Sequence, residues 1–365
     1  MCGIVGYIGG QKASPILLSG LMKLEYRGYD SAGIATLEDG TPTVVKNTGR
    51  VRNLYQDPQL DALTGTVGIA HTRWATHGEP SDVNSHPHST PRVSIVHNGI
   101  IENYGPLKAD LMAKGVTFES ETDTEVLVKL IDYFCCAQPK QSPLAALREA
   151  LAMVRGSYAL AVLFKDYPDT IFAVKRESPL IVGWGEGENF VASDIPALLK
   201  YTRRYSVLEE GDMAVCTAEG IRFYNEFAEP VQRPALTADW DMEAAEKGGY
   251  PHFMLKEINE QPTAITATVS PRVEDGMPDL RIPQLTDEVL RGIGTVHLVG
   301  CGTAMHAGMV GKAAIETLAR VPAEVDIASE FRYRDPILNP NDLVIIISQA
   351  GETSDCLLYT SPSPR

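Results

Sequence analysis

The second residue, Cys2, is the group in this sequence that is best suited to covalent chemistry. Removal of the initiator methionine, which a small second residue favours, would leave a thiol and a free α-amine on one residue. Because an α-amine has a reference pKa of about 7.7–8.0, part of it is neutral near pH 7 and can accept the thiol proton. The alternative is that Cys2 is a small buried residue at the start of a strand, where Gly3 and Gly6 allow a close backbone approach.

Three later segments carry groups that could bind and polarise an amide substrate. Arg73 has a planar guanidinium that matches a carboxylate, and Trp74 beside it suits a mobile aromatic lid. The side-chain N–H of Asn98 and the backbone N–H of Gly99 could together form an oxyanion hole. Asp123 lies in the first turn of an expected helix and could pair with a substrate ammonium group. Around an activated thiol, such groups favour the functional interpretation.

Each of these residues also has a structural interpretation. Arg73 could lie on the surface and Trp74 in the core. The dipeptide Asn98-Gly99 is typical of a hairpin turn. An aspartate in a first helical turn usually complements the helix dipole, which would explain Asp123 without a ligand.

Four histidines raise the alternative of a metal site. Their spacings of six, nine and two residues, on loops that contain prolines, match no helix-based zinc motif. The residues concerned are His71, His77, His86 and His88. We therefore expect no metal.

The elements that must position these groups can be read from the pattern of the first 225 residues or so. Short β-rich runs, most of them separated by Gly, Pro, Asp or Asn, predict strands at Val67–Ala70, Val93–His97, Ser157–Phe164, Thr170–Val174, Leu180–Trp184, Met213–Cys216 and Ile221–Tyr224. Helix starts are predicted at Ser14-Pro15 and Ser142-Pro143, with serine as N-cap, and at the capping box Thr122-x-x-Glu125. Clustered strands predict an α+β domain with largely antiparallel sheets in two stacked layers.

The pattern changes twice further along the chain. Residues 226–262 are interrupted by prolines and glycines, and the polar stretch His252–Gln261 before Pro262 is typical of a linker. From about residue 285, strands are predicted at Thr295–Val299, Ala323–Ile327 and Leu343–Ile347, with a helix to about Leu318 after the first. Strand, small-residue loop, helix and strand make a βαβ unit of a parallel sheet.

Two loops of this second region could bind an anion without lysine. Each follows a predicted parallel strand, so that hydroxyls, backbone N–H groups and a helix N-terminus come together. The candidate residues are Thr303, Ser348, Gln349 and Thr353. The alternative is ordinary Ser/Thr capping of two strand-to-helix turns. Neither loop fits a Walker motif or a dinucleotide fingerprint.

Composition limits the classes of partner. At about 150 residues per domain, 365 residues predict two or three domains. The net charge of −15 and the pI of about 5.0 argue against nucleic acid and anionic lipid as partners. No secretory signal and no membrane span are predicted. Six cysteines without a Cys-x-x-Cys pair indicate reduced thiols and a cytoplasmic location.

Five dispersed motifs, in order, resemble the class II (N-terminal nucleophile) glutamine amidotransferases. They are Cys2–Gly6, Tyr26–Gly33, His71–Gly78, His97–Asn103 and Ser120–Glu125. The resemblance implies a four-layer αββα glutaminase fold without a cofactor. It implies Cys2 as nucleophile and Asn98 and Gly99 as oxyanion hole. It further implies Trp74 as a gate. The glutamine-binding residues that it implies are Arg73, Thr76, His77 and Asp123.

The second region resembles a sugar-isomerase (SIS) domain. The resemblance implies that Thr303, Ser348, Gln349 and Thr353 hold the phosphate of fructose-6-phosphate, which receives ammonia to become glucosamine-6-phosphate. Ala304 and Ala350 stand where the family commonly has serine. The intact enzyme is expected to be a homodimer.

The expected organisation is a glutaminase domain at 1–225, a linker with entry helices at 226–284, a truncated SIS domain at 285–356 and a foreign tail at 357–365. Such a fragment is expected to release glutamate without making hexosamine phosphate. Two alternatives are a purine-pathway amidotransferase and a non-catalytic sugar-phosphate-binding module. The first would need a pyrophosphate loop rich in acidic pairs, which Ser348–Thr353 is not.

Overall fold

The structure is a computed structural model that describes residues 2–38, 40–74, 78–137, 142–238, 249–274, 276–280, 282–348 and 356. The chain divides into two compact units, Met1–Ala245 (unit 1) and Glu246–Arg365 (unit 2). This division does not decide the expected limits of the glutaminase and SIS domains, which stay predictions. Within the described ranges, no helix is both long and apolar enough to cross a membrane.

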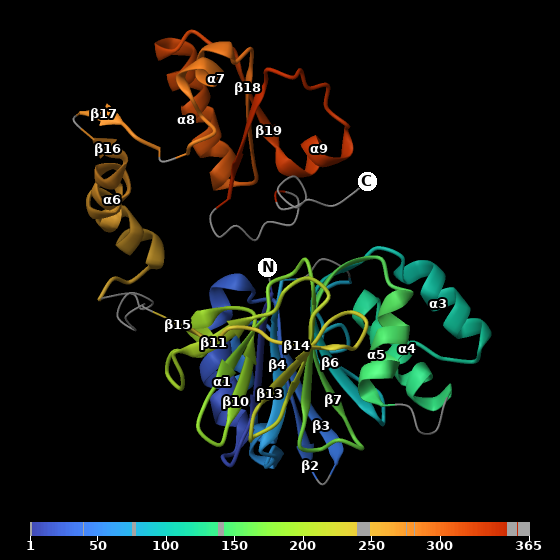
Figure 1. Cartoon of the computed structure of the whole chain (residues 1–365). Helices are drawn as coiled ribbons and strands as arrows, with labels where there is room; N and C mark the ends of the chain where they lie inside the picture. Colours follow the sequence, from blue (N-terminus) through green and yellow to red (C-terminus); the bar gives the residue numbers. More distant parts are fainter. Residues whose placement is uncertain are drawn as a thin grey trace. The chain divides into compact units, whose positions relative to one another are not determined.

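Unit 1 contains two antiparallel sheets with helices on their outer faces (Figure 1). The order of the first sheet is β15 (Leu236–Thr237), β11 (Arg204–Val207), β9 (Ile181–Trp184), β10 (Asn189–Ala192), β1 (Gly3–Ile8), β4 (Val67–Arg73), β2 (Ser31–Glu38) and β3 (Thr41–Thr48). The order of the second is β14 (Pro230–Val231), β13 (Ile221–Tyr224), β12 (Met213–Cys216), β8 (Ile171–Arg176), β7 (Gly156–Phe164), β6 (Val93–Ile101) and β5 (His88–Ser89). The expected α+β class with antiparallel sheets is confirmed.

Three apolar cores separate the layers of unit 1, and strand alternation explains them. In β1, Val5 and Tyr7 face the helix side, while Ile4 and Ile8 face the other sheet. The same alternation in β7 sends every second side chain into the core between the sheets. The outer helices are α1 (Ala13–Leu24) and α2 (Val51–Tyr55) on the first sheet, and α3 (Tyr104–Ala113), α4 (Asp123–Ala137) and α5 (Pro143–Ala152) on the second. The result is the four-layer αββα arrangement.

Two of the predicted helix caps can be compared directly with the structure. Ser142 is the N-cap of α5, because its side chain accepts a hydrogen bond from the backbone N–H of Ala145 at 3.3 Å. The prediction for Ser14 was wrong, since α1 already begins at Ala13 and Ser14 lies inside it. Ser14 is buried and its hydroxyl donates to the Leu63 carbonyl at 3.2 Å, so tertiary packing has replaced the capping role.

Unit 2 has a small parallel sheet, as the βαβ pattern predicted. Its strand order is β19 (Ala323–Ile327), β18 (Val296–Gly300) and β20 (Leu343–Ile347). Helix α8 (Thr303–Leu318) packs on the Leu298 side of β18, and α9 (Ala328–Tyr333) packs through Phe331 on the Val299 side. The unit also contains α7 (Asp287–Gly292) and a short hairpin of β16 (Val273–Glu274) and β17 (Met277–Pro278).

The polar stretch before Pro262 is helical in the structure. Helix α6 runs from Phe253 to Val269, with Pro262 inside it. An interior proline removes a helix hydrogen bond and often ends a helix, so the pattern placed the end of the stretch at Pro262, whereas α6 continues beyond it. The two-residue strands β14 and β15 also fall within the predicted junction, where they extend the sheets of unit 1.

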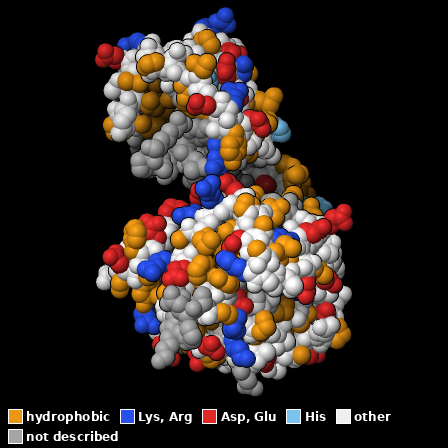
Figure 2. All heavy atoms as spheres, turned by 90° about the vertical axis from the view of Figure 1, so that its right-hand side faces the viewer, with side chains coloured by type: hydrophobic (Ala, Val, Ile, Leu, Met, Phe, Trp, Pro, Cys, Tyr) orange, Lys and Arg blue, Asp and Glu red, His pale blue; other side chains and the backbone are white. Residues whose placement is uncertain are grey.

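Acidic and basic side chains are interspersed on the face of the molecule that Figure 2 shows. All six cysteines are free thiols, as the sequence predicted.

Candidate active site

Cys2 lies at the start of the central strand β1, where the neighbouring strand ends. Gly3 pairs with Thr72 of β4, so the following residues of β4 reach Cys2. The backbone N–H of Trp74 donates a hydrogen bond to Cys2 Sγ at 3.2 Å. A Cβ at Gly28 would lie 2.6 Å from the carbonyl carbon of Arg73, so this glycine lets the chain pass closely beneath the thiol.

Burial raises the pKa of the Cys2 thiol above its usual value. The Trp74 N–H and the charge of Arg73 act in the opposite direction but do not cancel this effect. The thiol is therefore protonated at neutral pH and needs a base before it can attack. This fits an arrangement in which the α-amine of the same residue accepts the proton.

The amide of Asn98 is held in one orientation beside Cys2. Its Nδ2 donates to the Cys2 carbonyl at 3.0 Å, and its Oδ1 lies 3.0 Å from Nε2 of His71. Nε2 also lies 3.0 Å from the His97 carbonyl. Because both partners are acceptors, Nε2 must carry the proton, and burial lowers the pKa of His71 to about 3, which keeps the ring neutral. His71 thereby turns the N–H groups of Asn98 toward the nucleophile.

Asn98 and Gly99 are not a hairpin turn. Both lie inside strand β6, where Asn98 pairs with Ala159 and Gly99 with Tyr158 of β7. Gly99 has a φ of +133°, and a Cβ there would lie 2.1 Å from the Ser157 carbonyl oxygen. Only glycine fits this position, and its backbone lines the same pocket as Cys2.

Asp123 is the first residue of α4 and does more than complement the helix dipole. Its Oδ2 accepts the backbone N–H of Ile101 at 2.8 Å and lies 4.0 Å from Nδ1 of His97. The side chain is buried, and the residue lines the pocket beside Cys2. The end of β6 and the start of α4 are thus held together by a carboxylate that also faces the site.

The predicted capping box that positions Asp123 is present in altered form. Thr122 Oγ1 accepts the backbone N–H of Glu125 at 3.2 Å. The Glu125 carboxylate reaches past the N-cap to the N–H groups of Glu119 and Ser120 instead. Burial raises the pKa of Glu125, but the hydrogen bonds with Lys129 and these backbone groups lower it overall to about 2.

The structural interpretation placed Arg73 on the surface and Trp74 in the core, but the structure shows the reverse. Arg73 is 4% exposed and donates through Nη2 to the Gly78 carbonyl at 3.2 Å. Trp74 is 46% exposed, with its ring edge on Tyr29 at 5.5 Å between centroids. Thr76 and His77, the other predicted glutamine-binding residues, lie outside the described residues.

A narrow pocket joins most of the predicted residues. It is lined by Cys2, Arg73, Trp74, His86, His97, Gly99, Thr122, Asp123 and Thr124. A thiol, the backbone of Gly99, a guanidinium and a carboxylate therefore line one pocket, and the Asn98 amide bonds the carbonyl of Cys2 beside it. Such a set can bind a zwitterionic amino acid and stabilise an oxyanion next to a sulfur nucleophile.

The four buried histidines of unit 1 form a supporting layer that the sequence did not predict. The rings of His71 and His86 lie 4.1 Å apart between centroids, and those of His86 and His88 lie 5.1 Å apart. Two of the rings contact hydroxyls at the N-terminus of α4. His97 Nδ1 lies 2.9 Å from Thr124 Oγ1, and His88 Nε2 lies 3.0 Å from Thr122 Oγ1. Burial lowers the pKa of His88 to about 3 and that of His86 well below its usual value.

In unit 2, two of the four predicted phosphate-binding residues are described. Gly300 pairs with Ile347, so the carboxyl ends of β18 and β20 lie side by side. Thr303 opens α8 and is exposed, and Ser348 follows β20 and is half-buried. We call Gly300–Thr303 and Ser348 the loop edge. Gln349, Thr353 and Ala350 lie outside the described residues, as do residues 357–365.

The same sheet also brings together groups that could hold a metal ion, which the sequence did not predict. Ligand atoms of His297, Glu324 and Asp326 lie within 4.8 Å of one another. Asp326, however, already accepts a hydrogen bond from Arg334 at 2.7 Å. His297 faces a second carboxylate, Asp342, at 3.6 Å. Asp326 is thus already engaged by a guanidinium, and His297 lies between the carboxylates of Glu324 and Asp342.

Family models match two parts of the chain. The glutamine amidotransferase domain matches residues 71–200 and the SIS domain matches residues 290–360. Two curated relatives are both described as glutamine–fructose-6-phosphate aminotransferase (isomerizing). The one from Caldanaerobacter subterraneus subsp. tengcongensis is 53% identical over the full chain and 60% of its own length. The one from Clostridium acetobutylicum is 52% identical over 98% of this chain and 59% of its own length.

The chain thus spans about three fifths of the length of the curated relatives it matches. Among solved structures, the chain is similar to one described as the allosteric regulatory enzyme of purine biosynthesis. The TM-score is 0.55 at 27% identity, and the match covers 62% of this chain and 49% of that one. The fold of unit 1 is shared with that enzyme, while the identity to the aminotransferases is about twice as high.

Proposed function

Because this chain belongs to the glutamine amidotransferase family and carries a SIS domain as well, we propose that it hydrolyses glutamine at Cys2 to supply ammonia. The observation that carries the proposal is the shared pocket. Cys2 and the backbone of Gly99 line this pocket, and the Asn98 amide, which His71 orients, donates to the carbonyl of Cys2.

The first chemical step is attack by Cys2. The α-amine accepts the thiol proton, and the thiolate attacks the side-chain carbonyl carbon of glutamine. Asn98 Nδ2 has two N–H groups and uses one on the Cys2 carbonyl, so one remains for the developing oxyanion. The carbon–nitrogen bond then breaks, and ammonia leaves with the proton that the α-ammonium returns. Water hydrolyses the thioester to glutamate and restores the thiol.

Recognition of glutamine uses opposite charges on two sides of the pocket. The buried guanidinium of Arg73 pairs with the α-carboxylate, and the Asp123 carboxylate pairs with the α-ammonium. Thr76 and His77 complete the set. Trp74, half-exposed beside the thiol, acts as the gate.

For the whole protein, the proposal is transfer of the ammonia to fructose-6-phosphate to form glucosamine-6-phosphate. The names of the relatives support this reaction. Thr303, Ser348, Gln349 and Thr353 bind the sugar phosphate at the loop edge. The intact enzyme is a homodimer in the cytoplasm, a location that the six free thiols favour. The acidic surface argues against nucleic acid and membranes as partners.

The test is glutamate release by the chain, measured separately from hexosamine phosphate. Cys2→Ala is expected to abolish glutamate release, and 6-diazo-5-oxo-L-norleucine is expected to label Cys2 covalently. Intact mass would show whether the initiator methionine is removed, as the α-amine base requires. A retained methionine together with an unlabelled Cys2 would favour the non-catalytic sugar-phosphate-binding module. Undiminished glutamate release by Cys2→Ala would contradict the mechanism.

A further inference from the structure

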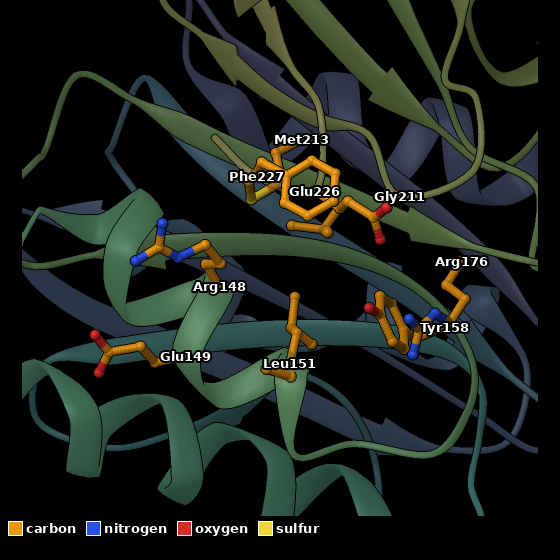
Figure 3. Close-up of a pocket in the computed structure, with 11 residues that line it drawn as sticks. Arg148, Glu149, Leu151, Tyr158, Arg176, Gly211, Met213, Glu226 and Phe227 are labelled. Carbon is orange, nitrogen blue, oxygen red and sulfur yellow. The ribbon is translucent and has the colours of Figure 1, made fainter. Parts of the chain in front are cut away.

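Unit 1 has a second cavity that the proposed glutaminase reaction does not use. Its volume is about 440 Å³, within the range of about 300–1,000 Å³ that is usual for small-molecule sites. Its walls come from α5, β7, β8, β12 and the turn after β13 (Figure 3). The lining residues are Arg148, Glu149, Leu151, Ala152, Tyr158, Val174, Arg176, Gly211, Met213, Glu226 and Phe227.

The floor of the cavity is apolar and reaches the core outside the second sheet. Leu151, Tyr158, Val174 and Met213 are all buried members of that core. On the rim, the Phe227 ring is 66% exposed. The site therefore has an apolar floor and an aromatic side chain at its mouth.

One polar atom of the wall points into this apolar space. Tyr158 is only 4% exposed as a residue, but its hydroxyl is not one of the buried side-chain atoms that lack a partner, so it opens on the cavity. Figure 3 shows the hydroxyl turned toward the cavity. A phenolic hydroxyl that opens on a cavity can donate a hydrogen bond to, or accept one from, a polar atom of a bound molecule.

The two arginines of the cavity have guanidinium donors that are not used by a carboxylate of the described residues. In the described part of the chain, neither Arg148 nor Arg176 forms an ion pair with a carboxylate. Arg176 lies over the Tyr158 ring at 5.6 Å and donates to the Val154 carbonyl at 3.4 Å, while Arg148 is exposed on α5. Two carboxylates, Glu149 and Glu226, line the cavity as well, so an anion must be held by the arginine forks against them. Arginine forks match carboxylates, sulfonates and phosphates.

We propose that this cavity binds a small amphiphilic anion with an aromatic body. The body lies against Leu151, Met213 and Phe227, the anionic group pairs with Arg148, and a polar atom of the ligand bonds the Tyr158 hydroxyl. Glu226 lines the same cavity and repels an anion, so its removal should raise the affinity for the ligand, whereas removal of Arg148 should lower it. The site is separate from the Cys2 pocket, because no residue lines both.

The probe is 8-anilinonaphthalene-1-sulfonate, an aromatic anion whose fluorescence rises in apolar surroundings, titrated into the full chain. Ala152 lies exposed at the end of α5 on the cavity wall, so Ala152→Phe should close the mouth without disturbing the core. We expect it to weaken probe binding at least tenfold. The matched control is Met153→Phe, at the adjacent exposed residue that does not line the cavity, and it should leave the affinity unchanged.

Charge variants then test the anion. Arg148→Gln should weaken binding of the sulfonate roughly fivefold, which is the size expected for one exposed ion pair. Glu226→Gln should strengthen its binding. The neutral analogue N-phenyl-1-naphthylamine should bind without responding to either change. Glutamate release by all four variants serves as the check of folding. Two results would overturn the proposal. One is an affinity for the sulfonate that Ala152→Phe leaves unchanged, and the other is an equal loss of affinity for the sulfonate and the neutral analogue in Arg148→Gln.

Discussion

The Cys2 pocket of unit 1 and the loop edge of unit 2 present their polar groups in opposite ways. Around Cys2, the predicted side chains of Arg73, Asn98 and Asp123 are buried, and each has a hydrogen-bond partner, as Asn98 has in His71. At the loop edge, Thr303 is exposed and Ser348 only half-buried. The first site is organised before a ligand arrives, whereas the second offers hydroxyls at a strand edge. Changes in the supporting layer should therefore affect the first site strongly and the second weakly.

The largest expected effect is on the stability of unit 1 in acid. Burial lowers the pKa values of His71 and His88 to about 3, and that of His86 well below its usual value, so these rings stay neutral in the folded state. The unfolded chain binds their protons below pH 6.5. Stability is therefore complete above pH 6.5 and falls as the pH decreases toward 3, by up to about 1.4 kcal/mol per pH unit for each histidine.

Urea unfolding followed by tryptophan fluorescence measures this, because Trp74 and Trp184 lie in the folded part of unit 1. His88→Gln can keep the hydrogen bond to Thr122 but removes one titrating ring, so it should flatten the dependence between pH 6.5 and 4. Glu125, with a pKa of about 2, adds a second loss only between about pH 4.5 and 2. A free energy of unfolding that stays constant from pH 6.5 to 4.5 would contradict the neutral histidine layer.

The next effect concerns the oxyanion donor. Asn98→Ala should lower kcat for glutamate release by about 10²–10³-fold, the usual loss when one oxyanion-hole donor is removed. KM should change much less, because the Nδ2 group acts on charge that develops in the transition state. Steady-state glutamate release gives both constants. A variant that raises KM at an unchanged kcat would instead assign Asn98 to substrate binding.

His71 should show a smaller effect, because it acts through Asn98. His71→Leu removes the N–H that holds Asn98 Oδ1, so we expect kcat to fall by roughly tenfold with little change in KM. His71→Gln offers a side-chain N–H of similar reach and should recover most of the activity. If both variants lose the same activity and unfold at the same lower urea concentration, His71 has only a structural role.

These results bear on what could be predicted from the sequence. Spacing and residue type predicted Cys2, Arg73, Gly99 and Asp123 in one pocket, because each belongs to a local motif. His71 was recognised only as a metal alternative. It lies in β4 of the first sheet and reaches Asn98 in β6 of the second, a contact between sheets that no local pattern contains.

The other errors have similar causes. The start of α1 was displaced because the Ser14 hydroxyl bonds a carbonyl of another segment, which is tertiary information. Pro262 marked a break where α6 continues. Helix ends depend on which backbone groups find distant partners, so they are the part of a fold that local sequence predicts least well.

The smallest expected effect concerns the loop edge, and it completes the comparison. Thr303→Ala should weaken binding of fructose-6-phosphate about fivefold, the loss of one hydrogen bond to a charged group in an exposed site. Ala304→Ser, which adds the hydroxyl that the family commonly has there, should strengthen binding by a similar factor. Both variants should leave glutamate release within twofold of the original, since the loop edge organises no group of the Cys2 pocket. Calorimetric titration with fructose-6-phosphate gives the Kd values, and inorganic phosphate shows whether the phosphate alone accounts for them. If neither variant changes the Kd, the phosphate is held elsewhere, and the resemblance of this loop to a sugar-phosphate site is one of fold only.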